Sequence, residues 1–227
     1  MCNLFSMTRS QAAIIAVARV MVDKTGNLPP MPGIFPDYAA PIVRNTTDGR
    51  ELALARWGMP SPVFALKGRN SDPGVTNVRN TASPHWRRWL APDCRCVVPF
   101  TSFSENEALP DGRKPPIWFA LADDRPLAFF AGICVQGWTS VRKVKEGETT
   151  NDLFAFLTTE PNALVGTYHP KAMPVVLTTP EEIDTWLEAP TAIALQLQRP
   201  LADDALVVVA RGQKQDGGTE VPPGLLI

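Results

Sequence analysis

The sequence has few cysteines and no long hydrophobic run. Four cysteines in 227 residues are too sparse for a disulfide scaffold, so we expect free thiols in a reducing compartment. No uninterrupted apolar stretch reaches the roughly 18 to 20 residues that a membrane-spanning helix needs. The first residues also lack the basic start and apolar run of a secretory signal. We therefore expect a cytoplasmic protein that spans no membrane.

The sequence also lacks a strong net charge, because 22 basic residues face 23 acidic ones, and the total indicates no particular partner. The distribution is uneven, since the stretch 56–96 holds seven basic residues and two acidic ones. Five flat rings are interleaved with these cations, namely Trp57, Phe64, His85, Trp86 and Trp89. Such a stretch suits a single-stranded nucleic acid, whose phosphates attract cations and whose unpaired bases stack on rings. The alternative is a set of core tryptophans beneath a solvated basic face, and composition favours neither.

Long helices are a further absence, since 23 prolines favour turns and short strands. Thr8 followed by Gln11 resembles a capping box, and the apolar residues of 12–22 recur at helical spacing. We therefore expect an early helix that ends before Gly26. The stretch 27–50 is rich in Pro, Gly, Asn and Asp, which predicts a long irregular connection over the surface.

A second helix start lies near the C-terminal end. Thr179 precedes Pro180, and Glu182 completes a capping box, which predicts a short helix through Leu187. The charged segment 141–152 is expected to be a solvated loop. Short apolar runs bounded by turn residues predict strands at 96–100, 117–121, 127–135, 153–158, 175–177 and 206–209.

These elements favour an α+β fold. We expect a single domain over residues 1–210, with a mixed, mainly antiparallel β-sheet or barrel-like core flanked by short helices. A chain of 227 residues with 44% hydrophobic residues is long enough for one sizeable core. Residues 211–227 are polar and rich in Gly and Pro, and we expect them to form a partly disordered tail.

Cys2 combines two nucleophiles when it becomes the first residue. Removal of Met1, which a small second residue generally permits, would leave an α-amine and a thiol two carbons apart. The amine titrates near about 7.7 to 8.0 and a thiol near about 8.5, so each is partly reactive at neutral pH. An aminothiol condenses with an aldehyde, first to an imine and then to a five-membered thiazolidine ring. By position alone, a small and inert apolar residue is the stronger interpretation.

Six separated segments resemble, in order, the motifs of one protein family. They are Cys2 at the start; Trp57-Gly58; Asn77-Val78-Arg79-Asn80-Thr81; Arg95-Cys96-Val97-Val98-Pro99 leading to Glu105; Thr158-Thr159-Glu160-Pro161-Asn162; and His169-Pro170-Lys171-Ala172-Met173-Pro174. The family that they resemble is SRAP (SOS response-associated peptidase), whose members shield abasic sites in single-stranded DNA by covalent attachment. Each match is weak by itself, but their order and spacing across most of the chain make the resemblance specific.

The resemblance implies a catalytic set of four residues. Cys2 would attack the ring-opened aldehyde of an abasic sugar and form a thiazolidine crosslink. Glu105, rather than the neighbouring Glu107, would carry the protons that imine formation and ring closure require. His169 would protonate the ring oxygen of the sugar and promote its opening. Asn77 would hold the sugar or the N-terminal backbone.

A second set is expected to bind the DNA strand. It comprises Arg79, whose planar guanidinium suits a phosphate, together with Trp57, Arg69, Arg87, Arg88 and Lys171. Within this set, packing is the stronger interpretation for Trp57. The expected partner is single-stranded DNA with abasic sites, bound by a monomer that is associated with the nucleoid while on DNA. We expect no cofactor and no metal, because Cys94 and Cys96 would need two further ligands and the candidates are scattered.

The chain departs from the family pattern at three places. Leu4 stands where the usual Cys-Gly-Arg opening has its arginine, Asn106 ends a segment that usually reads Gly-Phe-Tyr-Glu-Trp, and Lys171 replaces an arginine. The first change removes a cation beside the nucleophile, so one phosphate contact is either missing or supplied elsewhere.

Two other functions stay open. One is a peptidase in which Cys2 attacks a peptide carbonyl and removes Met1 itself, and the other is a non-catalytic binder of single strands.

Overall fold

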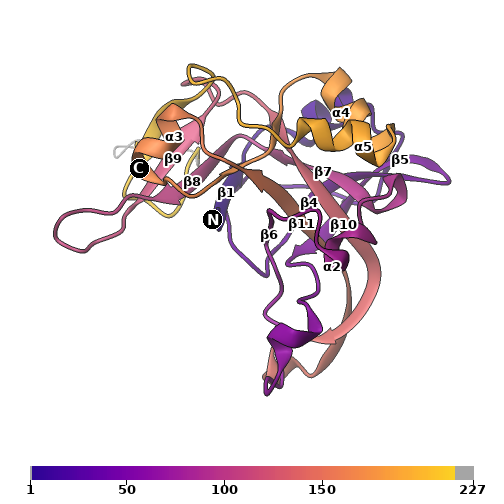
Figure 1. Cartoon of the computed structure of the whole chain (residues 1–227). Helices are drawn as coiled ribbons and strands as arrows, with labels where there is room; N and C mark the ends of the chain where they lie inside the picture. The colour runs from indigo at the N-terminus through magenta and orange to yellow at the C-terminus, as the bar shows by residue number, and fades with distance from the viewer. Residues whose placement is uncertain (1, 218–227) are drawn as a thin grey trace, which may run out of the picture.

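The structure, a computed structural model, describes residues 2–217; Met1 and residues 218–227 lie outside that range. Five strands form a closed barrel (Figure 1): β4 (Ala39–Thr46), β5 (Gly49–Trp57), β7 (Arg95–Phe100), β10 (Ala128–Val141) and β11 (Glu148–Thr159). Neighbours along the path β11-β10-β7-β4-β5 are antiparallel, and a short parallel pairing of β11 with β5 closes the ring. This mixed, mainly antiparallel barrel with short helices confirms the expected fold class.

Aromatic side chains fill the interior of the barrel. The rings of Phe130 and Phe156 lie 4.6 Å apart, and Trp57 packs on Phe156 at 5.1 Å. Phe5, near the start of the chain, presents its ring edge to Trp57, also at 5.1 Å. All four rings are fully buried, and large buried rings contribute strongly to core stability. The core therefore anchors Phe5, and with it the backbone that follows Cys2.

A second sheet holds the start of the chain on both sides. Its order is β14 (Val207–Arg211), β9 (Pro116–Ala120), β8 (Ser102–Asn106), β1 (Leu4–Met7) and β3 (Met31–Ile34). Phe5 of β1 pairs with Phe103 of β8 and with Ile34 of β3. Both faces of β1 are buried. A slip by one residue would exchange the side chains of the two faces and move Phe5 out of the aromatic core, so this register is strongly specified.

Short elements surround the two sheets. They are the helices α1 (Gln11–Ala18), α2 (Pro84–Arg87), α3 (Ala163–Tyr168), α4 (Pro180–Glu188) and α5 (Thr191–Ala194), the 3-10 turns η1 (Val63–Leu66), η2 (Pro92–Cys94), η3 (Val144–Glu146) and η4 (Leu195–Leu197), and the two-residue strands β2 (Val22–Asp23), β6 (Asn77–Val78), β12 (Met173–Pro174) and β13 (Val176–Leu177). Within residues 2–217, no helix is long and apolar enough to cross a membrane.

The two expected helices differ in how well their ends were predicted. The later one is confirmed as α4, where the hydroxyl of Thr179 accepts the backbone N–H of Glu182. The early helix is shorter than the apolar spacing indicated. Ser10, not Thr8, caps α1, and Arg19 ends it in a left-handed conformation with φ 53°, since helices commonly stop at such a residue.

The irregular connection expected at 27–50 is wrong, because β3, β4 and the start of β5 lie within it. Pro41 is tolerated inside β4 for a local reason. β4 pairs with β7 only at Val43 and Arg44, so at Pro41 the strand has no neighbour on that side and a missing N–H breaks no ladder bond. The proline content therefore predicted an irregular connection where the structure has the barrel strand β4, which pairs with β7 along only part of one edge.

The solvated loop expected at 141–152 is also wrong. β10 and β11 continue as one long hairpin, in which Trp138 pairs with Asn151 and Thr139 with Thr150, and Figure 1 shows this hairpin curving away from the barrel. Only residues 142–147 form its turn. Threonine, which recurs in this hairpin, fits a pleated surface well, so a search for apolar runs missed the extension.

Residues 211–217, the first part of the expected tail, pack against the rest of the structure. β14 runs to Arg211, and Asp216 is buried. The carboxylate of Asp216 accepts hydrogen bonds from Arg125 at 2.7 and 2.8 Å and from the hydroxyl of Ser102 at 2.6 Å. Residues up to 217 therefore pack beside the second sheet, and the rest of the expected tail lies outside the described residues.

Candidate functional site

The backbone of Cys2 is held by the side chain of Asn77. Asn77 opens β6, which pairs in parallel with β11 at Phe156, and its Nδ2 donates to the carbonyl oxygen of Cys2 at 2.8 Å. The same nitrogen lies 2.8 Å from Oγ1 of Thr76, which in turn donates to Oδ1 of Asn3 at 3.1 Å. Of the two uses expected for Asn77, the structure therefore places it on the N-terminal backbone.

Glu105 and His169 lie beside this N-terminal segment. Glu105 comes from β8, the neighbour of β1, and is only 4% exposed. Burial raises the pKa of its carboxyl to about 7, since the charged form is poorly solvated there. His169 follows α3, and its Nδ1 lies 3.7 Å from Oε2 of Glu105. Burial, assisted by the charge of Lys171, lowers the pKa of His169, so this imidazole is mainly neutral at pH 7.

The thiol of Cys2 differs from the expectation drawn from its sequence position. Its side chain is fully buried, with Sγ 3.5 Å from the carbonyl oxygen of Leu4. Burial raises the pKa of this thiol, and the nearby Glu105 carboxylate raises it further. The sulfur is therefore protonated at neutral pH, and it becomes a nucleophile only when a base takes its proton.

A small pocket adjoins these residues. Its volume is about 200 Å³, and its lining consists of Asn3, Leu4, Phe35, Ser104, Glu105, Asn106, Lys114, Pro116 and Lys214. Two of these side chains, Lys114 and Lys214, did not emerge from the sequence, because each stands in a polar stretch without a motif. Only the pairing of distant strands shows that both reach the pocket that Glu105 lines.

Arg79 and Lys171 lie near His169 but do not contact Cys2. The guanidinium of Arg79 donates to the backbone oxygens of Thr159 and Lys171, at 2.7 and 3.1 Å, and pairs with Glu160 at 3.4 Å. Its side chain is 46% exposed, and Lys171 is exposed as well. Arg79 thus ties together the chain segments on either side of α3 while keeping a solvent-facing edge.

The tryptophans of the basic stretch belong to the core. Trp57 is fully buried and donates from Nε1 to the carbonyl oxygen of Thr76, so it has no ring face for a base and is wrong as a DNA contact. Trp86 and Trp89, left open by the sequence, are buried too. Among the five rings of this stretch, only Phe64 is largely exposed, at 74%.

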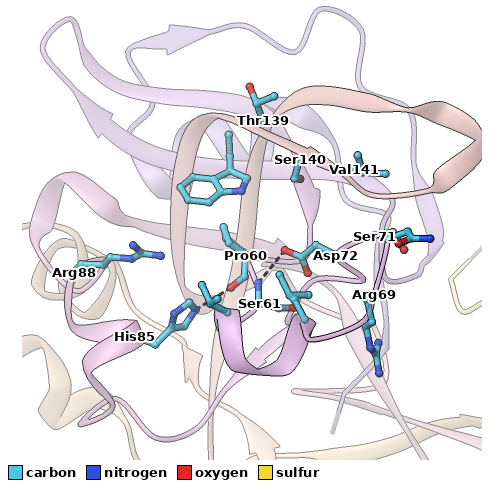
Figure 2. Close-up of a pocket in the computed structure, with 14 residues that line it drawn as sticks. Pro60, Ser61, Arg69, Ser71, Asp72, His85, Arg88, Thr139, Ser140 and Val141 are labelled. Atoms are coloured by element: carbon cyan, nitrogen blue, oxygen red, sulfur yellow. Dashed lines mark hydrogen bonds between the residues drawn. The ribbon is translucent and has the colours of Figure 1, made fainter.

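Two other arginines expected to bind DNA, Arg69 and Arg88, line a pocket that is separate from the one beside Glu105. Arg69 and Arg88 line a larger pocket of about 490 Å³ between η1, α2 and the β10–β11 hairpin. Figure 2 shows them on opposite sides of Pro60, Ser61 and Asp72. Arg88 also packs over the ring of Trp89 at 3.8 Å. This pocket shares no residue with the pocket beside Glu105.

Arg87 is exposed and donates to the backbone oxygen of Ala82. Other cations of the basic stretch serve the fold instead. Arg56 pairs with Asp37 at 2.6 Å, and the buried Arg95 donates to backbone oxygens, including that of Leu90 at 2.9 Å. The local positive charge available to a ligand is therefore smaller than composition indicated.

No metal centre is evident in the part of the chain that the structure describes. Residues 2–217 contain no group of three or more His, Cys, Asp or Glu side chains placed to hold a metal ion. Cys2, Cys94, Cys96 and Cys134 are free thiols. At the site itself, the buried thiol of Cys2 lies with the carboxyl of Glu105 and the imidazole of His169 beside it.

Comparison with known proteins agrees with this description. Residues 1–211 match the model of the family described as SOS response associated peptidase (SRAP), so the chain belongs to that family and has a function associated with DNA damage. No curated protein matches the chain. Solved structures with the same fold include a protein from Bordetella bronchiseptica, at 23% identity and a TM-score of 0.69, covering 91% of this chain and 98% of the other.

Two further solved structures share the fold. A protein from Bacteroides thetaiotaomicron is 23% identical, with a TM-score of 0.68 over 91% of this chain and 90% of the other. A phage-related protein from Bordetella bronchiseptica is 22% identical, with a TM-score of 0.65 over 91% of this chain and 92% of the other.

Proposed function

We propose that the protein binds single-stranded DNA and captures abasic sites covalently through Cys2 after Met1 has been removed. The observation that carries this proposal is the convergence of Cys2, Asn77, Glu105 and His169, which lie up to 167 positions apart in the sequence and meet at one site. A cluster that served only packing would not need a carboxyl whose pKa is near 7. A group that transfers protons at neutral pH does need such a pKa.

The proposed reaction is a condensation. The α-amine of Cys2 attacks C1′ of the ring-opened sugar aldehyde and forms a carbinolamine, which loses one water molecule to give an imine. The thiol then adds its sulfur to the imine carbon, and its proton ends on the ring nitrogen of the thiazolidine. Aldehyde and aminothiol thus yield thiazolidine and water, with no oxidant or reductant required.

Glu105 supports each proton transfer in this scheme. With a pKa near 7, the carboxyl is about half protonated at neutral pH, so it can protonate the leaving hydroxyl and later accept the thiol proton. His169, whose Nδ1 lies 3.7 Å from Oε2 of Glu105, is assigned the protonation of the ring oxygen of the sugar. Asn77 holds the Cys2 carbonyl, which keeps both nucleophiles aimed at the aldehyde.

The DNA strand is assigned to the exposed cations around the site. Arg79 and Lys171 lie near His169, Arg69 and Arg88 line the pocket in Figure 2, and the exposed Arg87 is the chain neighbour of Arg88. Phe64 replaces the buried tryptophans as the stacking ring, because its face is exposed. Cations bind the backbone and the ring stacks on a base, which suits an unpaired strand.

The test mixes Met1-free protein with a single-stranded oligonucleotide that contains one abasic site, followed by denaturing electrophoresis. The wild-type protein should give an adduct that survives denaturation, and Cys2→Ala should give none. Glu105→Gln should slow adduct formation by about 10²- to 10⁴-fold, the usual contribution of a general acid or base. Glu107→Gln is the matched control, two residues away and paired with Arg211, and should keep the wild-type rate.

Two results would overturn the proposal. A wild-type protein that binds the oligonucleotide but forms no adduct would leave a non-catalytic binder. Loss of Met1 from the purified full-length chain, detected by mass spectrometry without any aminopeptidase and abolished by Cys2→Ala, together with no adduct, would instead favour the peptidase.

A further inference from the structure

The pocket beside Glu105 is lined by two lysines from distant parts of the chain. Lys114 comes from the loop that joins β8 and β9, and Lys214 comes from the segment after β14. Leu4 lines the same pocket, although the family resemblance calls for a cation at that position. Positive charge is therefore present in this pocket, but it is supplied by residues other than the fourth.

The backbone around Lys214 is fixed rather than loosely laid on the surface. Trp118 donates from Nε1 to the carbonyl oxygen of Gln213 at 2.8 Å, and the N–H of Asp216 donates to Pro32 at 2.8 Å. Gly33 of β3 packs closely against the same segment, since a Cβ there would lie 2.8 Å from the carbonyl oxygen of Lys214. With the buried Asp216 carboxylate as a further anchor, Lys214 is held at the pocket.

Lys114 is held by a short hairpin ladder. The N–H of Glu107 donates to the oxygen of Pro115 at 3.0 Å, and that of Leu109 donates to Arg113 at 3.0 Å. Both ammonium groups are exposed, and neither forms an ion pair with any residue of 2–217. Their charge is thus available to an anion that enters the pocket.

We propose that Lys114 and Lys214 bind the phosphodiester next to the captured abasic sugar, with the side chain of Asn106 beside them. The inference rests on the proposed function, because it assigns a substrate group to a pocket that Glu105 lines. A volume of about 200 Å³ is below the roughly 300 to 1,000 Å³ of pockets that hold a drug-sized ligand, which suits a sugar-phosphate unit. Binding the phosphate here would place C1′ near Glu105 and Cys2 and offset the missing cation at Leu4.

The test measures equilibrium binding by fluorescence anisotropy. The probe is a single-stranded oligonucleotide with a tetrahydrofuran abasic analogue, which has no aldehyde and cannot be crosslinked. The Lys114→Ala/Lys214→Ala double variant should bind about tenfold more weakly than the wild type. Its salt dependence should also be shallower, with the slope of log K against log salt reduced by about 0.7, because the two lysines neutralise one phosphate and each neutralised phosphate of a single strand contributes about 0.7 to that slope.

A matched control and a modified probe locate the binding position of the phosphate. Lys145→Ala removes an exposed lysine at the tip of the β10–β11 hairpin and should leave both binding and slope unchanged. A neutral methylphosphonate beside the tetrahydrofuran should weaken wild-type binding as the double substitution does, and should have little further effect on the double variant.

The outcomes separate this inference from the proposed function. Wild-type affinity and salt slope in the double variant would overturn the lysine site, even if the protein crosslinks to natural abasic DNA. Failure of the wild type to crosslink, with lysine-dependent binding intact, would instead overturn the covalent chemistry. A wild-type protein that does not bind the probe would overturn both.

Discussion

Glu105→Gln should make the folded protein more stable at neutral pH, although we expect it to impair capture. Glu105 is almost fully buried, and that burial raises the pKa of its carboxyl to about 7. Ionising it in the folded protein is therefore costly. Glutamine has nearly the same shape and cannot ionise, so the substitution removes that cost together with the proposed proton carrier.

The magnitude and its pH range follow from proton linkage. A free Glu carboxyl titrates near about 4.3, and one pK unit corresponds to about 1.36 kcal/mol, so a folded-state pKa near 7 costs on the order of 3 kcal/mol once the group is fully ionised. Between those two pKa values the folded state binds more protons than the unfolded state, and stability falls as pH rises. The contribution of Glu105 to the free energy of unfolding is fully present below about pH 4 and is lost as the pH rises through about 7.

The assay is urea denaturation of wild type and Glu105→Gln at pH 5 and pH 8. The stability advantage of the variant over the wild type should be larger at pH 8 than at pH 5 by about 2 to 3 kcal/mol. Comparing the variant with the wild type cancels the titration of the carboxyls that both proteins retain. One of these is Asp37, which is partly buried but whose pKa is lowered to about 2 by hydrogen bonds from Arg56. An advantage that does not change with pH would refute the reasoning.

Two further predictions concern the parts of the fold that position the site. Asp216→Ala should lower the free energy of unfolding by about 3 kcal/mol, because it leaves the guanidinium of Arg125 without its buried partner; thermal denaturation checks this, and an unchanged Tm would contradict it. Gly58→Ala should destabilise by more than Gly68→Ala, which is expected to cost about 1 kcal/mol. Both glycines have positive φ, but a Cβ at Gly58 would collide with the guanidinium of Arg142 while Gly68 faces open space, so equal losses in urea denaturation would contradict the packing argument.

The sequence predicted the elements whose signals are local. The cap at Thr179 depends on residues within one helical turn, and α4 begins where the cap indicated. The strands β7 and β9 are buried apolar runs bounded by turns, and they also begin within one residue of the prediction. Elements with polar or proline-containing sequences were missed, because Pro41 and the threonines of the long hairpin are tolerated through pairing with distant strands.

For the candidate site as well, some residues were predicted from the sequence and others were not. Motif order led to Cys2, Asn77, Glu105 and His169, and these residues meet in the structure. Composition placed Trp57 among the possible DNA contacts, with packing as the stronger interpretation, and the structure shows it in the core; a count of rings carries no information on which face is buried. Lys114 and Lys214 stand in stretches that read as loop and tail, and only the three-dimensional pairing of β8 with β9 and the anchoring of residues 213–216 place them together.

Cys2 and Glu105 are both buried, and burial raises the pKa of each side chain. A thiol at the surface would be partly ionised at neutral pH and open to oxidation, whereas Cys2 is buried, and the raised pKa of its thiol keeps the sulfur protonated. The same environment brings Glu105 to a pKa near 7, where one carboxyl can act first as an acid and then as a base. In the proposed reaction, the sulfur is activated only after Glu105 has given its proton to the leaving hydroxyl and has become ionised, which couples imine formation to ring closure. The stability lost through Glu105 is the thermodynamic counterpart of that proposed coupling.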